Sequence, residues 1–190
     1  MRKEKNKKIF LIGFALFIVL SMTLSIFAVI LDNPQDNLKY GKQKFTITNT
    51  GYSTKINGKA MEFTSYPSEL EYLNISSDIK QLLGNAQAIT FLFDPNSSKE
   101  DLVYLDSARF DLQNKYPKPV LYGITQSSLT YNIPELSCSN TTTYNPIIFF
   151  NISSSLSITN NNNCIIINSK LRELIAVENR LLYQAYGIMS

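Results

Sequence analysis

The stretch Ala88–Phe93, AITFLF, decides the fold because it is a short, unbroken apolar run bounded by turn residues. Such a run predicts a β-strand that is covered on both faces and lies near the centre of a sheet. A second apolar run, Val120–Thr125, predicts another apolar strand.

The segment between these two strands predicts an α-helix that ends near Lys115. Ser97 or Ser98 can cap its N-terminus, and acidic residues follow in the first turn, where the helix dipole favours negative charge. Apolar residues recur on one face of this helix: Leu102, Leu105, Ala108 and Leu112. A strand, a helix and a strand in this order predict a βαβ unit with parallel strands and a right-handed crossover.

The chain on either side completes a mixed sheet. Alternating residues from Phe45 to Tyr66, with Asn57-Gly58 inside, predict an antiparallel meander, because a type I′ turn needs positive φ at both central positions. Two further strands are expected at Pro146–Ile152 and Cys164–Asn168, separated by an asparagine-rich tip, residues 153–163, without structure of its own. Residues 126–144 read as a long loop.

Two more helices are expected. A short one covers Ser77–Leu83, and a long amphipathic one begins at Asn168 or Ser169 and closes at Gly187. The fold class is therefore α/β, or α+β with a mixed sheet: a meander, a βαβ unit and a C-terminal helix in one domain, residues 45–190.

The stretch Ile9–Leu31 contains no charged residue. As a helix it would extend roughly 34 Å, slightly more than the roughly 30 Å hydrocarbon core of a bilayer. It is too long for the apolar part of a cleaved signal peptide, the alternative, and it ends without a small-x-small site. We therefore expect a transmembrane helix over residues 9–31, with residues 1–8 as a basic cytoplasmic tail and residues 32–44 as a linker to an extracytoplasmic domain.

Charge and composition exclude several function classes. The chain has a formal net charge of +3, but the tail contributes five basic residues and one acidic residue, which leaves −1 for the remainder. This balance does not favour nucleic acid as a partner. The chain has no histidine, which excludes catalysis that needs an imidazole. No sequence motif points to a metal or a cofactor, and we expect neither.

Cys138 and Cys164 are the two cysteines of the chain. On an oxidising side of the membrane they predict a disulfide, with two buried thiols as the alternative. The compartment also permits glycosylation at four Asn-x-Ser/Thr sequons, but this number is close to the chance expectation for so asparagine-rich a chain.

Glu178 is the most unusual polar residue, because it falls in the middle of the apolar stripe of the C-terminal helix. A carboxyl group there needs a partner or must be neutral. One interpretation is structural: a satisfied core residue, with Arg109, Arg172, Arg180 or the backbone of the Cys138 loop as candidate partners, or an exposed edge of the stripe. The other is a polar pocket in which Asp106, Arg109 and Glu178 converge.

Two functions are compatible with these features. The first is a non-enzymatic binding or assembly module at the cell surface, which contacts a protein or an envelope polymer through the Cys138 loop and the asparagine-rich tip. The alternative is a hydrolase acting on envelope glycan with a pair of carboxylates drawn from Asp94, Asp101, Asp106 and Glu178.

Overall fold

The computed structural model describes residues 13–25 and 38–189. Residues 13–25 form a helix with exposed side chains, and the other parts of the expected span, residues 9–12 and 26–31, lie outside the described residues, as do the tail and residues 32–37. Among the described residues, no helix has both the length and the apolar character needed to cross a bilayer. The chain divides into two compact units, residues 1–37 and 38–190, and the second contains the sheets.

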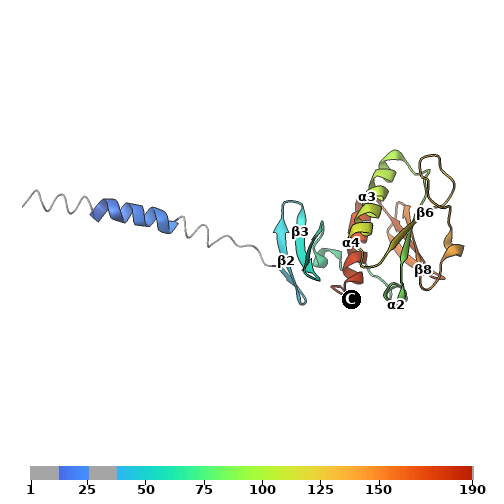
Figure 1. The fold of residues 1–190 in the computed structure, drawn as a ribbon, viewed down its shortest axis with the longest axis horizontal. Helices are drawn as coiled ribbons and strands as arrows, with labels where there is room; N and C mark the ends of the chain where they lie inside the picture. The colour runs from blue at the N-terminus through green and yellow to red at the C-terminus, as the bar shows by residue number, and fades with distance from the viewer. Residues whose placement is uncertain (1–12, 26–37, 190) are drawn as a thin grey trace, which may run out of the picture. The chain divides into compact units, whose positions relative to one another are not determined.

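Residues 38–189 form two sheets and a helical layer (Figure 1). The strands are β1 (Leu38–Tyr40), β2 (Gln43–Thr48), β3 (Gly51–Ile56), β4 (Lys59–Phe63), β5 (Ile89–Phe93), β6 (Val120–Ile124), β7 (Ile147–Ile152), β8 (Ser157–Asn161) and β9 (Cys164–Ser169). The α-helices are α2 (Ser77–Asn85), α3 (Lys99–Lys115) and α4 (Leu174–Ala185). Short 3₁₀ turns are η1 (Pro67–Leu70), η2 (Cys138–Asn140) and η3 (Leu171–Glu173).

The first sheet is the expected antiparallel meander, in the order β1-β2-β3-β4. Asn57 and Gly58 have φ values of 51° and 81° and make the predicted turn between β3 and β4. The sheet begins earlier than the sequence indicated. Residues 38–44, which we assigned to the linker, form β1, a turn at Gly41 with φ of 56°, and the start of β2.

The second sheet has the order β6-β5-β7-β9-β8. Strand β5 lies between β6 and β7 and pairs with both in parallel, and all five of its residues are buried. The βαβ unit β5-α3-β6 is therefore confirmed, and Ser98 caps α3 by accepting a 3.1 Å hydrogen bond from the Asp101 N–H.

The prediction of an unstructured tip at residues 153–163 is wrong, because β8 forms there and pairs antiparallel with β9. The asparagines make the turn of this hairpin. Asn162 and Asn163 have φ values of 51° and 70°, a conformation that Asn adopts more readily than most residues. The Asn160 side chain accepts a 3.1 Å hydrogen bond from the Asn163 N–H.

Helices α3 and α4 lie between the two sheets, and α2 lies below the second sheet in the view of Figure 1. One hydrophobic core contains buried residues of all three helices, such as Leu82 of α2, Leu105 of α3 and Val177 of α4. Alternate residues of the second sheet, such as Phe91, pack in the same core. On the other side of α4, the Tyr183 ring stacks on Phe63 and meets Phe45 edge-on, and these rings join the meander to the helix. The domain is thus layered as sheet, helices and sheet (Figure 1).

Candidate binding cleft

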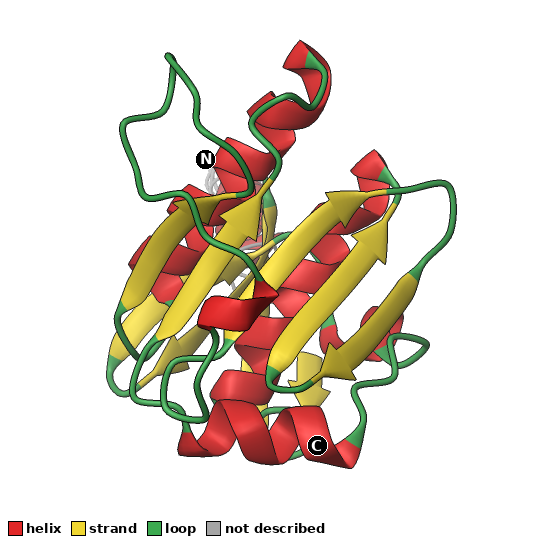
Figure 2. Cartoon of the chain, turned by 90° about the vertical axis from the view of Figure 1, so that its right-hand side faces the viewer, coloured by secondary structure: helices red, strands yellow, loops and turns green. Residues whose placement is uncertain are grey.

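One face of the second sheet carries no α-helix, and we call it the open face. In Figure 2 this face is toward the viewer, with helices behind it and one segment, which includes the short 3₁₀ turn η2, crossing in front. That segment, residues 125–146, we call the bridged loop. It connects β6 to β7, which lies on the far side of β5. Parallel sheets are usually covered on both faces, so the open face is the exceptional surface of this fold.

The bridged loop first pairs with the edge of β6. The Ile124 N–H donates to the Pro134 carbonyl at 3.0 Å, and the Leu136 N–H donates to the Ile124 carbonyl at 2.8 Å. The Leu136 side chain then lies over Gly123, where an added Cβ would be 2.6 Å from Leu136 Cδ1. Glycine at this position therefore lets the loop approach the sheet closely.

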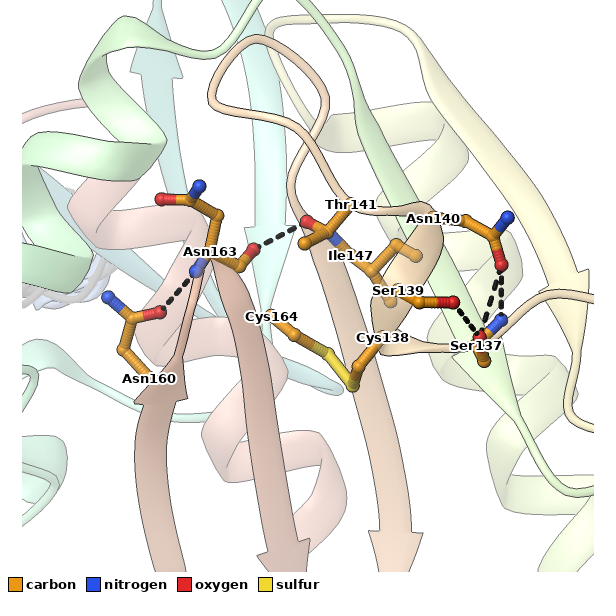
Figure 3. Close-up of a disulfide and its surroundings, with 9 residues drawn as sticks. All are labelled: Ser137, Cys138, Ser139, Asn140, Thr141, Ile147, Asn160, Asn163 and Cys164. Atoms are coloured by element: carbon orange, nitrogen blue, oxygen red, sulfur yellow. Dashed lines mark hydrogen bonds between the residues drawn. A yellow bond between two sulfur atoms is a disulfide. The ribbon is translucent and has the colours of Figure 1, made fainter.

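A disulfide joins the loop to the sheet. Cys138 and Cys164 are bonded, with a Cα–Cα distance of 5.4 Å, which confirms the predicted disulfide (Figure 3). Next to the disulfide, Thr141 Oγ1 donates to the Asn163 carbonyl at 2.7 Å and accepts from the Ile147 N–H at 3.1 Å (Figure 3). The loop is therefore attached to both β7 and the β8–β9 hairpin.

A cleft of about 610 Å³ lies between this loop and the amino ends of β5, β6 and β7. We call it the loop cleft. It is lined by Thr90, Val120, Leu121, Tyr122, Ile133, Pro134, Leu136, Asn140, Asn145 and Ile147. None of these residues carries a charge at neutral pH. Its volume lies in the range typical of small-ligand sites, which are mostly apolar with a few polar groups.

Two polar side chains belong to this cleft. Thr90 is 2% exposed, and its Oγ1 donates to Asn145 Oδ1 at 3.1 Å. The Asn145 amide is partly exposed, and no hydrogen bond from its Nδ2 is found in the part of the chain that the structure describes. The cleft can therefore offer an amide donor to an uncharged ligand.

Asp106 and Arg109 pair with each other at 2.9 Å, but they do not line the loop cleft. Asp106 Oδ2 accepts a 2.9 Å hydrogen bond from the Tyr131 hydroxyl, and the Arg109 guanidinium lies 5.1 Å from the centre of the Tyr122 ring. Burial and the bond to Asp106 raise the pKa of Tyr131. This pair holds the first part of the bridged loop against α3.

Glu178 is fully buried, so the alternative of an exposed edge of the stripe is wrong. None of the candidate arginines forms an ion pair with it within residues 38–189; its Oε2 accepts only a 3.3 Å contact from the Asn179 amide, and Oε1 has no partner there. Burial, with a contribution from Asp111, raises the pKa of Glu178 to about 8, although Lys115 opposes the shift.

The three predicted site residues fall into two groups. Asp111 and Lys115, the charged groups near Glu178, lie about 150° around α3 from Asp106 and Arg109 at 100° per residue. The contacts of the described residues therefore give no sign that Asp106, Arg109 and Glu178 share a pocket. The sequence analysis did not identify Thr90 and Asn145 as site residues, because neither belongs to a motif and their proximity depends on the pairing of β5 with β7.

Among the described residues, no group of three or more His, Cys, Asp or Glu side chains is arranged to hold a metal ion. Comparison of the chain with protein-family models, with curated proteins and with solved structures found no match.

Proposed function

We propose that this protein is a membrane-anchored, extracytoplasmic binding or assembly module without enzymatic activity, and that its ligand occupies the loop cleft. The observation that carries the proposal is the cleft itself. It is large, uncharged and mostly apolar, it contains a nearly buried hydroxyl and an amide nitrogen that has no partner among the described residues, and one of its walls is attached to the sheet by a disulfide. Such a site can bind and orient a ligand, and its lining residues include no carboxylate, lysine, histidine or cysteine.

The anchor in this proposal rests on the sequence. Residues 9–31 are uncharged, and basic residues precede them, which favours a cytoplasmic N-terminus. The bilayer would then be one partner of the chain. The Cys138–Cys164 bond fits the compartment on the far side of that bilayer, because disulfides form and persist in oxidising environments.

The alternative, a hydrolase for envelope glycan, has less support. It needs two carboxyl groups in one cleft, and four well-formed clefts of residues 38–189 are each lined by at most one carboxyl group. The carboxylates in question have other contacts: Asp94 accepts from Gln126, Asp101 accepts from Ser98, and Asp106 accepts from Tyr131.

Site-directed capture of small fragments tests the proposed site. Leu121 lines the loop cleft and is 49% exposed, so Leu121→Cys places a reactive thiol at the cleft. The matched control is Val103→Cys, at a 68% exposed position on α3. The full chain, in lipid nanodiscs, is incubated with disulfide-bearing fragments that are either uncharged and apolar or charged.

Intact-mass spectrometry then measures the fraction of chain captured by each fragment. We expect Leu121→Cys to capture uncharged apolar fragments at least tenfold more than charged ones, and Val103→Cys to show no such preference. Equal selectivity at the two positions would show that the loop cleft is not a binding site.

A further inference from the structure

The edge of β6 has main-chain groups that the bridged loop leaves unpaired. The Ile89 N–H donates to the Pro119 carbonyl, and the Thr125 N–H donates to the Phe93 carbonyl, each at 3.0 Å. In a parallel ladder, alternate residues bond to the same neighbour. Residues 119, 121, 123 and 125 therefore bond to β5, and residues 120, 122 and 124 point away from it.

Of the three outward residues, only Ile124 finds a partner. Its N–H and C=O bond to Pro134 and Leu136 of the bridged loop. For Val120 and Tyr122, no hydrogen bond on this outer side is found in residues 38–189. Two N–H and two C=O groups are thus left at an open strand edge, the arrangement to which an additional strand can pair.

These unpaired groups lie at the loop cleft, since Val120 and Tyr122 both line it. The Tyr122 ring lies against Arg109 on the side of the sheet that faces the helices, which leaves the main chain of Tyr122 at the cleft. Apolar side chains on the open face, including Leu121 and Ile147, form the adjacent floor. An open strand edge beside an apolar floor is the geometry of peptide recognition by strand addition.

We infer that the ligand of the loop cleft is an extended, uncharged peptide segment of a partner protein, which adds to the edge of β6 beside Val120 and Tyr122 and inserts apolar side chains into the cleft. The inference rests on the proposed function and names its partner class. Main-chain bonds to β6 supply direction and register, and alternate side chains supply specificity. The absence of charged lining residues selects against charged segments, whose desolvation would not be compensated.

A proline substitution tests the main-chain bonds directly. Val120 is the first residue of an edge strand and its N–H points outward, a position at which proline is compatible with a sheet. Val120→Pro therefore removes one outward donor and leaves the bonds between β5 and β6 in place. Leu121→Asp tests the apolar floor, and Phe110→Asp, at a 65% exposed site on α3, is the matched control for an added charge.

The probe is an array of immobilised, uncharged heptapeptides composed of Val, Ile, Thr, Ser and Gly, and the protein is the full chain in nanodiscs, with empty nanodiscs as the blank. We expect a subset of the peptides to bind. Val120→Pro and Leu121→Asp should each weaken binding at least tenfold, and Phe110→Asp should not change it. Two versions of a bound peptide, each methylated on every second main-chain nitrogen, should differ. The version methylated on the nitrogens that face β6 should lose binding, and the version methylated on the other nitrogens should keep it. Hydrogen exchange at the Tyr122 amide should slow when the peptide binds.

Three results would overturn this inference. The first is that no peptide binds. The second is that Val120→Pro binds peptide as the wild type does while melting within a few degrees of it. The third is that the chain forms dimers that Val120→Pro dissociates, because the edge would then pair with a second copy of the chain. Selective fragment capture at Leu121→Cys without peptide binding would leave the binding module intact and reject only the peptide as its ligand. Absence of both selective fragment capture and peptide binding would reject the binding module itself.

Discussion

At the scale of single residues, Glu178 shows what a sequence pattern can predict. Its angular position among the apolar residues of α4 predicts burial, and the carboxyl group is fully buried. Its surroundings were not predictable, because they depend on which flank of α3 packs against α4. The structure places Asp111 and Lys115 nearby, and no candidate arginine forms an ion pair with the carboxyl group within the described domain.

The buried Glu178 makes the stability of the domain depend on pH. Its pKa is about 8 in the folded protein and about 4.5 in the unfolded chain. Below pH 4.5 both forms are protonated, and as the pH rises toward 8 the unfolded chain gains the charge first. The free energy of unfolding should therefore fall across this interval.

Replacement of Glu178 by Gln should remove this pH dependence, because the amide does not ionise. We expect the variant to be more stable than the wild type at pH 8, by about 4 kcal/mol, and to show a flatter pH profile between pH 5 and 8. Urea unfolding followed by tyrosine fluorescence measures both. Glu135→Gln, at an exposed position, is the control and should keep the wild-type slope. Equal slopes for Glu178→Gln and the wild type would contradict this account.

At the scale of elements, the strongly patterned segments were predictable and β8 was not. The apolar runs of β5, β6, β7 and β9 identify these segments as strands by themselves, although β6 lies at the edge of the sheet and is only partly buried. Strand β8 has few apolar residues and is held by pairing with β9, so its own sequence contains little signal. Its neighbouring asparagines are compatible with an unstructured tip and with a tight turn, and only the pairing distinguishes the two.

The turn between β8 and β9 can be tested at Asn162, whose φ is 51°. Asn162→Val should destabilise the domain by about 1–2 kcal/mol, because a β-branched residue is strongly disfavoured at positive φ. Thr159→Val, at an exposed position within β8, is the matched control and should be neutral or slightly stabilising. Urea midpoints compare the two variants. Similar midpoints would show that residues 162–163 do not require this conformation.

The disulfide of the bridged loop should stabilise the domain as a whole. It joins residues that are 26 positions apart, and closing a loop of this size contributes about 3 kcal/mol in the chain-entropy model. The double variant Cys138→Ala/Cys164→Ala should lose about this much in the free energy of unfolding. Reduction of the wild type should lower the free energy of unfolding by a similar amount. Because reduction keeps both cysteine side chains, this comparison separates the contribution of the bond from that of the side chains. An unchanged urea midpoint in both cases would be inconsistent with a stabilising bridge.

At the scale of the whole molecule, composition and periodicity predicted a mixed α/β domain but not its layers. Nothing in the sequence predicts that the meander packs on α4 through the rings of Phe45, Phe63 and Tyr183, since these contacts join segments more than a hundred residues apart. For the same reason the open face and its cleft could not be predicted. They result from the bridged loop, and not a helix, crossing that side of the sheet.

The account depends most on the location of this domain outside the membrane with its disulfide formed. The direct measurement uses the full chain, tagged at both ends, in cells stripped of their outer wall and treated with external protease and a maleimide. We predict that protease removes the C-terminal tag and spares the N-terminal one, and that Cys138 and Cys164 react with maleimide only after reduction. Survival of the C-terminal tag, together with thiols that react without reductant, would contradict the account.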